Sequence, residues 1–217
     1  VPISAIVLGG RRTQMVPLVT ESFNWQHGVY LGVRTGSETT AAAAHQVGQL
    51  RRDPMAMLPF CGYNMGDYFR HWLNIGKKLT QPPKVFSVNW FRVDDKGKFA
   101  WPGFGENIRV LKWIVDRVNN RVSARETPLG LIPDLKDMDR QGLSMSEDDL
   151  EKLFEVNPRA WQPELGDIKT FFDQFGDRMP DALWQEHKNF SVLLDRLHNE
   201  SLDEFERDMK YENKGGS

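Results

Sequence analysis

The residues best suited to chemistry are the aromatic side chains of residues 85–107, which read VFSVNWFRVDDKGKFAWPGFGEN. Aromatic side chains can hold a flat ring by stacking, while a side-chain amide or a backbone N–H reads the edge of that ring. The segment therefore predicts a slot for a flat ring. On the pattern alone, the alternative that these rings only pack a core and a hairpin stays open. The aromatic residues concerned are Phe86, Trp90, Phe91, Phe99, Trp101 and Phe104.

A hairpin followed by a helix would position these rings. Residues 85–92 are rich in β-branched and aromatic side chains, which predicts a strand. The Asp-Asp-Lys-Gly sequence at 94–97 predicts the turn because glycine tolerates positive φ, and residues 98–101 are expected to return as the second strand. Apolar residues at helical spacing then predict a helix, with Asn107 as its N-cap.

Two arginines form a second candidate site. The apolar run at residues 3–8 predicts a strand covered on both faces, and a glycine pair then leads to Arg11 and Arg12. In an open α/β sheet, ligands usually bind at the carboxyl ends of the strands. Two arginines there could hold a polyphosphate through charge-assisted hydrogen bonds. A solvated surface pair is the alternative.

Residues 35–49, TGSETTAAAAHQVGQ, consist mainly of small residues that offer little to anchor a core. Such a segment has few contacts to break when it moves, so the pattern predicts a lid that opens and closes. The alternative is an ordinary alanine-rich helical turn, which helix propensity favours.

Two further reactive side chains are expected to be structural. Residues 25–33, WQHGVYLGV, are expected to form a strand whose glycines allow close backbone approach. His27 within it is expected to be packed or hydrogen-bonded, because no second ligand lies at metal-binding spacing. Cys61 is expected to be a buried, inert thiol.

Helices are expected elsewhere in the chain. Residues 67–79 should form one helix, and residues 146–149 should begin another. Residues 168–175 and 182–197 have the pattern of amphipathic helices with solvated charged faces. In the first helix Tyr68, Trp72 and Ile75 are expected to share one face, and in the second Leu150, Leu153 and Phe154 are expected to point inward.

Composition excludes several classes of protein. Of 217 residues, 40% are hydrophobic and 27% charged, which predicts a globular core. A net charge of −2 without a basic block argues against nucleic-acid binding, and no apolar run is long enough for a membrane span. A single cysteine excludes an internal disulfide and suits a reducing compartment, so a cytoplasmic location is expected.

The pattern VNWFRxDxxGKFxWPGFGEN within residues 85–107 resembles the guanine-binding segment of the GTP-dependent phosphoenolpyruvate carboxykinases. The resemblance covers residues 1–133 well and the remainder loosely. Family members are much longer and this chain has no initiator Met, so it is identified as their C-terminal third. The other matching motifs are GGRR at 9–12, WQHGV at 25–29, SETTAAA at 37–43 and RRDPMAMLPFCGYNMGDY at 51–68.

This resemblance implies a mixed α/β (α+β) fold. Residues 1–133 would be part of the nucleotide-binding mixed-sheet domain, containing the lid at 35–49 and the guanine-binding hairpin at 85–107. Residues 134–210 would form a helical C-terminal region, and residues 211–217, YENKGGS, a flexible tail.

The implied reaction is decarboxylation of oxaloacetate and phosphorylation of the enolate by GTP, giving phosphoenolpyruvate, CO2 and GDP in gluconeogenesis. The family requires Mn2+ or Mg2+. Arg11 would contact the terminal phosphates, with Arg12 as the second candidate, and the lid would shield the enolate from protonation by water. The implied nucleotide-binding residues are Arg11, Phe91, Phe99, Phe104, Gly105, Glu106 and Asn107. The implied lid residues are Glu38, Thr39, Thr40, Ala41, Ala42, Ala43, Ala44, His45 and Gly48.

Other family elements are missing from this sequence. It contains no GxxxxGK[ST] phosphate loop and no metal-ligand spacing, so both are expected upstream, and the chain alone is expected to be inactive and without catalytic residues of its own. The family often carries an arginine where Gly36 stands, and whether Arg34 replaces it stays open. Expected partners are oxaloacetate or phosphoenolpyruvate and the upstream remainder of a monomeric protein. The rival interpretation is a non-catalytic module whose aromatic hairpin binds a nucleotide or a peptide ring.

Overall fold

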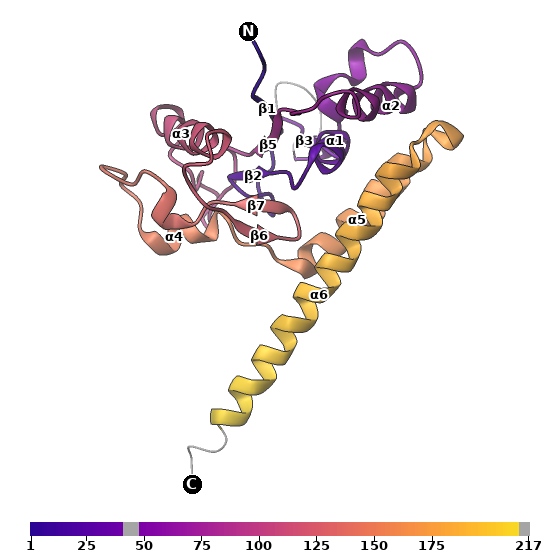
Figure 1. Cartoon of the computed structure of the whole chain (residues 1–217). Helices are drawn as coiled ribbons and strands as arrows, with labels where there is room; N and C mark the ends of the chain where they lie inside the picture. The colour runs from indigo at the N-terminus through magenta and orange to yellow at the C-terminus, as the bar shows by residue number, and fades with distance from the viewer. Residues whose placement is uncertain (41–47, 213–217) are drawn as a thin grey trace.

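The centre of the molecule is a five-stranded mixed sheet with strand order β1-β5-β2-β7-β6 (Figure 1). The computed structural model describes residues 1–40 and 48–212, with side chains up to residue 203. β1 runs parallel to β5, and the other neighbouring pairs are antiparallel. With its helices, this sheet confirms the predicted mixed α/β class. The strands are β1 (Ala5–Gly9), β2 (Val19–Glu21), β5 (Lys84–Val88), β6 (Arg125–Thr127) and β7 (Gly130–Ile132).

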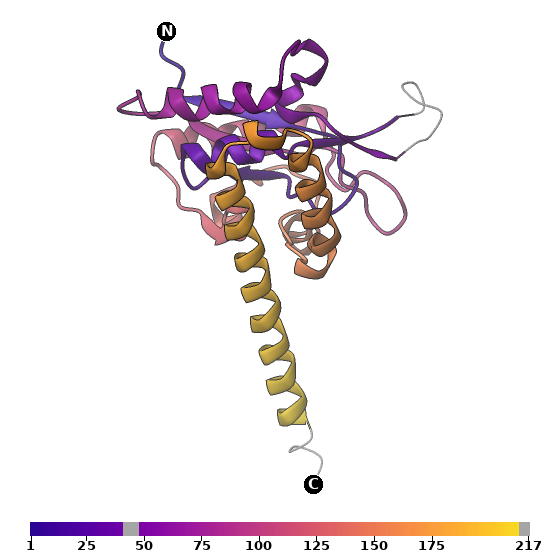
Figure 2. The ribbon, with the colours of Figure 1, turned by 90° about the vertical axis from the view of Figure 1, so that its right-hand side faces the viewer.

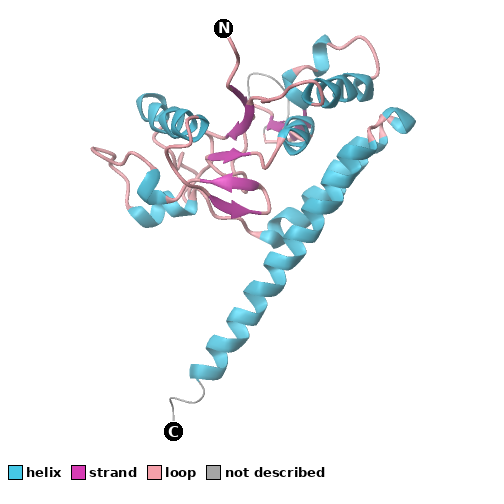
Figure 3. Ribbon diagram, viewed as in Figure 1, coloured by secondary structure: helices cyan, strands magenta, loops and turns pink. Residues whose placement is uncertain are grey.

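Helices cover the sheet in two groups (Figure 3). One hydrophobic cluster joins α1 and α2 to α5 and α6, and a second joins the sheet to α3 and α4. In the second cluster Phe86 of β5 meets Trp113 of α3 edge to face, with ring centroids 6.0 Å apart. The helices are α1 (Trp25–Val33), α2 (Met65–Gly76), α3 (Asn107–Val118), α4 (Glu147–Lys152), α5 (Pro158–Asp173) and α6 (Asp181–Glu212), with short 3₁₀ helices at Pro54–Ala56, Leu58–Phe60, Phe104–Glu106, Leu135–Asp137 and Gly176–Arg178.

Among the described strands, β1 lies at an edge of the sheet and pairs with β5 alone. Its Val7 is 43% exposed and Ile3, just before it, is 69% exposed. The expectation that this strand is covered on both faces is therefore wrong for the chain described here. None of the described helices is both long and apolar enough to cross a membrane.

The predicted strand at residues 25–33 is wrong, because these residues form helix α1. The side chain of Asn24 caps it by accepting a hydrogen bond from the His27 N–H at 2.9 Å. A Cβ at Gly28 would lie 2.6 Å from Val85, so glycine lets the helix lie close against β5. A continuous apolar run does not distinguish a buried helix from a buried strand.

The predicted hairpin is only partly formed. Its first strand, β5, ends at Val88, and the expected second strand at 98–101 is replaced by a single bridge between Val93 and Phe99. The predicted turn is confirmed: the Asp94 N–H donates to the Lys98 carbonyl at 2.8 Å, and Gly97 has φ +73°. The segment is therefore a loop closed by a tight turn rather than a two-stranded ribbon.

The predicted helix at 67–79 corresponds to α2, which spans Met65–Gly76. Phe69 and Leu73 are buried, whereas Tyr68, Trp72 and Ile75 are half-buried. Trp72 instead stacks on Trp25, with ring centroids 5.6 Å apart. Tyr68 and Trp72 therefore pack at the margin of the core rather than inside it.

The C-terminal helices are longer than predicted. Asn157 caps α5 by accepting from the N–H groups of Arg159 and Ala160, so this helix begins well before residue 168. α6 lies beside α5 and extends beyond the body of the molecule (Figure 2). It continues to residue 212, so the first two residues of the predicted tail are helical, and residues 213–217 lie outside the described part of the chain.

The helix expected from residue 146 is confirmed as α4. The Ser146 side chain accepts from the Asp149 N–H at 3.1 Å, which caps the helix. Leu150, Leu153 and Phe154 are each 1% exposed, as predicted. The first hydrophobic cluster contains residues from both sides of residue 133, and the division of the chain there stays a prediction.

Candidate functional site

Arg11 and Phe91 meet beside the carboxyl end of β1. The Arg11 guanidinium lies over the Phe91 ring, with its Cζ 4.0 Å from the ring centroid. Phe91 in turn meets Phe99 edge to face, with ring centroids 6.0 Å apart. Arg11 forms no ion pair with any described residue. The structure therefore brings a free cation and two of the predicted stacking rings together.

The side chain of Asn89 holds this arrangement. Its Oδ1 accepts from the Arg12 and Phe91 N–H groups, each at 3.2 Å, and its Nδ2 donates to the Arg12 carbonyl at 2.8 Å. Asn89 is only 1% exposed, so these bonds satisfy an otherwise costly buried amide. Sequence reasoning missed Asn89, although a single amide at the end of an apolar strand was a usable signal.

Phe104 stands apart from the other two rings. It is 99% exposed, Phe99 is 58% exposed, and among the described rings none contacts Phe104. Phe104 has φ +38° and follows Gly103 with φ +74°. An exposed ring held on a strained backbone is unusual unless something covers it. The structure thus brings Phe91 and Phe99 together but leaves Phe104 open to solvent.

Asn107 is not the N-cap of α3, which corrects the sequence prediction. It has helical angles of φ −58° and ψ −25°, because the 3₁₀ helix Phe104–Glu106 already begins the turn before it. Its Oδ1 instead accepts from the indole N–H of Trp101 at 2.8 Å. The Glu106 carboxylate pairs with Arg109, and Gly105 is exposed. At this turn the Asn107 amide and the backbone are therefore the groups left for a ligand.

The base of the predicted lid is an antiparallel hairpin of β3 (Gly36–Glu38) and β4 (Leu50–Arg52), which projects from the body in Figure 2. Thr39 and Gly48 extend it, since the Gly48 N–H donates to the Thr39 carbonyl at 2.9 Å. The predicted lid residues Ala41, Ala42, Ala43, Ala44 and His45 lie outside the described residues, as does the alternative of an alanine-rich helix.

This hairpin begins directly beside Arg11. The Arg11 N–H donates to the Ser37 hydroxyl at 3.1 Å, and the Glu38 N–H donates to the Arg11 carbonyl at 2.8 Å. The Glu38 carboxylate also accepts from the N–H and the hydroxyl of Thr13 at 2.9 and 3.1 Å. The loop that carries Arg11 and the base of the predicted lid are therefore one hydrogen-bonded unit.

Arg12 points the opposite way, into a buried ionic cluster. It donates two hydrogen bonds of 3.0 Å to Glu164 of α5, and Arg52 of β4 forms an ion pair with Glu164 at 2.7 Å. Burial acts to raise the pKa of Glu164, but the hydrogen bonds from Arg12 and the charges of both arginines outweigh it and lower that pKa. Arg12 is 8% exposed and its charge is neutralised, so it is structural in this arrangement.

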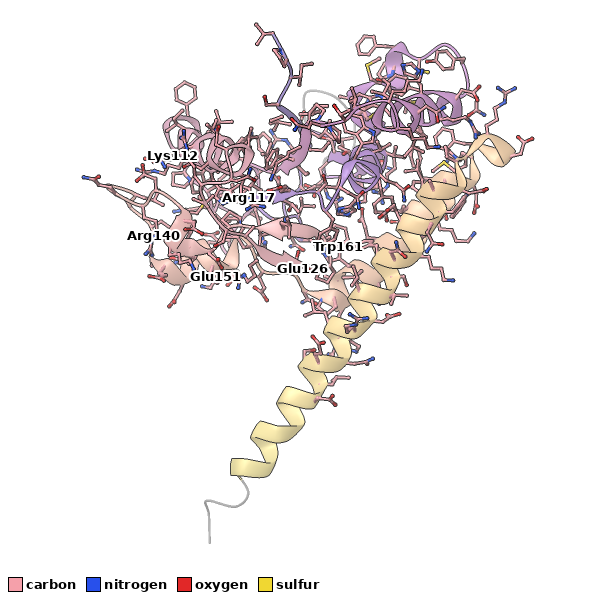
Figure 4. All side chains as sticks on the ribbon, in the orientation of Figure 1. Lys112, Arg117, Glu126, Arg140, Glu151 and Trp161 are labelled. Carbon is pink, nitrogen blue, oxygen red and sulfur yellow. The ribbon has the colours of Figure 1, made fainter. Side chains whose placement is uncertain are left out.

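Arg34 also points into the interior. Its guanidinium lies between the rings of Tyr30, Trp161 and Phe190, with Cζ to centroid distances of 5.6, 5.1 and 4.9 Å. Trp161 is labelled in Figure 4, where the long helices meet the body. Burial lowers the pKa of Arg34. Arg34 is thus enclosed by aromatic rings. Its guanidinium does not lie free beside the lid hairpin, where it could replace the arginine that the family often carries at the position of Gly36.

His27 is structural, as predicted. It is 4% exposed, and its Nδ1 accepts from the Phe23 N–H at 3.1 Å. Burial, and then the charge of Arg34, lowers the pKa of His27 to about 3, so the ring is neutral at physiological pH. Cys61, expected to be buried, is only half-buried, and its thiol donates to the Tyr63 carbonyl at 3.5 Å.

The described residues include no group of three or more His, Cys, Asp or Glu side chains that could hold a metal ion. The divalent metal that the resemblance implies therefore has no candidate ligand group among the described residues. The groups that this part of the chain offers to a ligand are the Arg11 guanidinium, the Phe91 and Phe99 rings and the β3–β4 hairpin beside them.

Comparison with known proteins matches this chain to one family. Residues 1–192 match the model of the phosphoenolpyruvate carboxykinase C-terminal P-loop domain. The phosphoenolpyruvate carboxykinase [GTP] of Thermoplasma volcanium is 50% identical over 186 residues, which are 86% of this chain and 31% of the relative. That of Anaeromyxobacter dehalogenans is 50% identical over 197 residues, 91% and 33% respectively. That of Chlamydia muridarum is 48% identical over 201 residues, 92% and 32%. The chain thus spans about a third of the length of these relatives.

Proposed function

This chain belongs to the GTP-dependent phosphoenolpyruvate carboxykinase family, and we propose that it supplies the guanine pocket, a phosphate-contacting arginine and the lid of such an enzyme. The observation that carries the proposal is the contact of Arg11 with Phe91. A cation that can bind phosphates and a ring that can stack on a base therefore lie in the same part of the molecule.

The base of GTP or GDP is bound by the aromatic rings of residues 85–107. Phe91 and Phe99 already form an edge-to-face pair, and Phe104 is the exposed ring that a bound base would cover. Stacking on an aromatic ring typically contributes about 1–3 kcal/mol per base. The Asn107 amide and the backbone of residues 104–107 read the edge of the base.

Arg11 binds the terminal phosphates, because its guanidinium has no competing carboxylate among the described residues. In the proposed reaction oxaloacetate loses CO2 and the resulting enolate takes the phosphoryl group of GTP. Mn2+ or Mg2+ would neutralise phosphate charge, and the upstream remainder would supply its ligands. The lid, whose base is hydrogen-bonded to the Arg11 loop, keeps water from protonating the enolate.

The upstream remainder of the protein is the partner that completes the site. β1 has an unpaired edge with exposed Val7, and α3 exposes Ile108, Leu111 and Val115 at helical spacing, by 64%, 42% and 53%. An unpaired strand edge and an apolar helix face are the surfaces that an adjoining segment covers. The metal ligands and phosphate loop would come with that segment, so this chain alone is inactive.

Turnover tests this proposal. The complete protein, incubated with oxaloacetate, GTP and Mn2+, is expected to form phosphoenolpyruvate, whereas this chain alone forms none under the same conditions. Turnover by this chain at the rate of the complete protein would contradict the assignment of the metal and phosphate groups to the upstream part. Nucleotide binding without turnover by the complete protein would instead favour the non-catalytic binding module.

A further inference from the structure

The indole of Trp101 decides which way the Asn107 amide faces. Trp101 is 1% exposed, and its N–H donates to Asn107 Oδ1 at 2.8 Å. An indole N–H can only donate, whereas an asparagine amide has an accepting end and a donating end. The bond therefore holds the oxygen of Asn107 against Trp101. Its Nδ2 forms no hydrogen bond with a described residue and is left to a ligand.

Reversing the amide would carry a free-energy cost. The donor Nδ2 would then face the indole N–H, and a donor buried at Trp101 would lose its acceptor. A buried polar group without a partner typically destabilises a protein more than a satisfied one stabilises it. Asn107 lies in the first turn of α3, directly after the exposed turn at Phe104, where the ring slot is proposed.

We propose that Trp101 sets the preference for guanine over adenine by holding Asn107 with its donor end toward the base. This inference rests on the function proposed above. Guanine carries the acceptor O6 where adenine carries the donor N6–H₂. An amide fixed as a donor pairs with O6 and opposes N6, while an amide free to turn accepts from N6 as well. Trp101 is thus a positioning residue that acts through Asn107.

A second tryptophan provides a matched control. Trp113 lies on α3, is also 1% exposed and belongs to the same hydrophobic cluster as Trp101. Its indole nitrogen has no hydrogen-bond partner among the residues that the structure describes. Replacing either tryptophan with phenylalanine removes comparable packing, but only Trp101→Phe removes a hydrogen bond to the proposed base-reading side chain.

The experiment measures kcat/KM of the complete enzyme with GTP, ITP and ATP for the wild type, Trp101→Phe and Trp113→Phe. We expect Trp101→Phe to lower the GTP-to-ATP ratio of kcat/KM about tenfold, the effect of about one hydrogen bond, mainly through KM. The GTP-to-ITP ratio should stay constant, because both bases present the same O6. Trp113→Phe should leave all three ratios unchanged.

An unchanged GTP-to-ATP ratio in Trp101→Phe, or an equal fall in Trp113→Phe, would overturn the inference. A wild-type enzyme that does not prefer GTP would instead overturn the proposed function. If Trp101→Phe does not fold, β-(3-benzothienyl)alanine at position 101 keeps the ring shape without the N–H, and the same fall in ratio is expected. In an Asn107→Ala background, removing the Trp101 N–H should have no further effect on selectivity, and a further fall would contradict action through Asn107.

Discussion

Arg11 and Arg12 are neighbours in the sequence, but their guanidinium groups lie in opposite environments. Arg11 lies over the Phe91 ring without an ion pair to any described residue, and the rings around it are partly exposed. Arg12 is buried against Glu164, which also binds Arg52. The proposed base site therefore leaves the Arg11 guanidinium available for a ligand, while the ionic cluster joins the Arg12 loop, the β3–β4 hairpin and α5 through its charges. Of these two adjacent arginines, Arg11 is the one proposed to bind a ligand, and Arg12 is the one whose ion pairs stabilise the fold.

The largest effect is expected from breaking the ionic cluster. Glu164→Gln leaves the largely buried Arg52 without its carboxylate and Arg12 with only the more distant Glu38, at 3.8 Å, so the free energy of unfolding of this chain should fall by about 3 kcal/mol. Urea denaturation measures the loss. The control, Asp173→Asn, removes the exposed Lys169–Asp173 pair and should cost less than about 1 kcal/mol. An equal loss of unfolding free energy in both variants would contradict this expectation, because the buried cluster would then contribute no more than an exposed ion pair.

The same carboxylate predicts a pH dependence. The pKa of Glu164 is lowered in the fold, so its contribution to stability is fully present above its ordinary value of 4.5. That contribution is lost as the pH falls through the lowered pKa. Denaturation curves of the wild type and Glu164→Gln should therefore converge at acid pH, and a constant difference between them would contradict this account.

Removing Arg11 should affect activity rather than stability. Arg11→Gln in the complete enzyme is expected to lower kcat/KM for GTP about a hundredfold, as for the loss of one charged group that stabilises a transition state. Its free energy of unfolding should hardly change, since Arg11 has no ion pair to lose among the described residues. Arg12→Gln should instead lower the free energy of unfolding clearly, because it removes the ion pair with Glu164. A stability loss for Arg11→Gln as large as for Arg12→Gln would abolish the contrast between the two regions.

A smaller effect is expected from the exposed ring. Phe104→Ala should weaken GDP binding by about 1–3 kcal/mol, the range for one stacked base. Because Phe104 is 99% exposed, the thermal stability of the Phe104→Ala protein without nucleotide should equal that of the wild type. Phe60, at the end of the 3₁₀ helix Leu58–Phe60, is 77% exposed, so Phe60→Ala is the matched control and should leave GDP affinity unaltered. Calorimetric titration distinguishes these outcomes.

Local chemistry made part of this structure predictable. The Asp94–Gly97 turn and the Ser146 cap follow from residues that act on their own neighbours. The family of the site also followed from the sequence, because its motif is long and specific. The association of Arg11 with Phe91 agrees with that expectation, although the two come from separate segments.

Long-range packing could not be predicted in the same way. The strand expected at residues 25–33 became α1 because Gly28 fits against Val85, a contact that no local pattern encodes. Asn107 was expected to cap α3, but the hydrogen bond from Trp101 and the preceding 3₁₀ helix gave it another position. The ion pairs of Glu164 were not predicted, because its partners Arg12 and Arg52 are far away along the chain.

The most direct test of the central claim is the affinity of the complete protein for GDP and for ADP, measured by calorimetry under identical salt and Mn2+ concentrations. The account predicts that GDP binds at least about tenfold more tightly, because the Asn107 amide and the backbone at residues 104–107 read the guanine edge. Equal affinities for GDP and ADP would contradict the assignment of this hairpin as a guanine pocket.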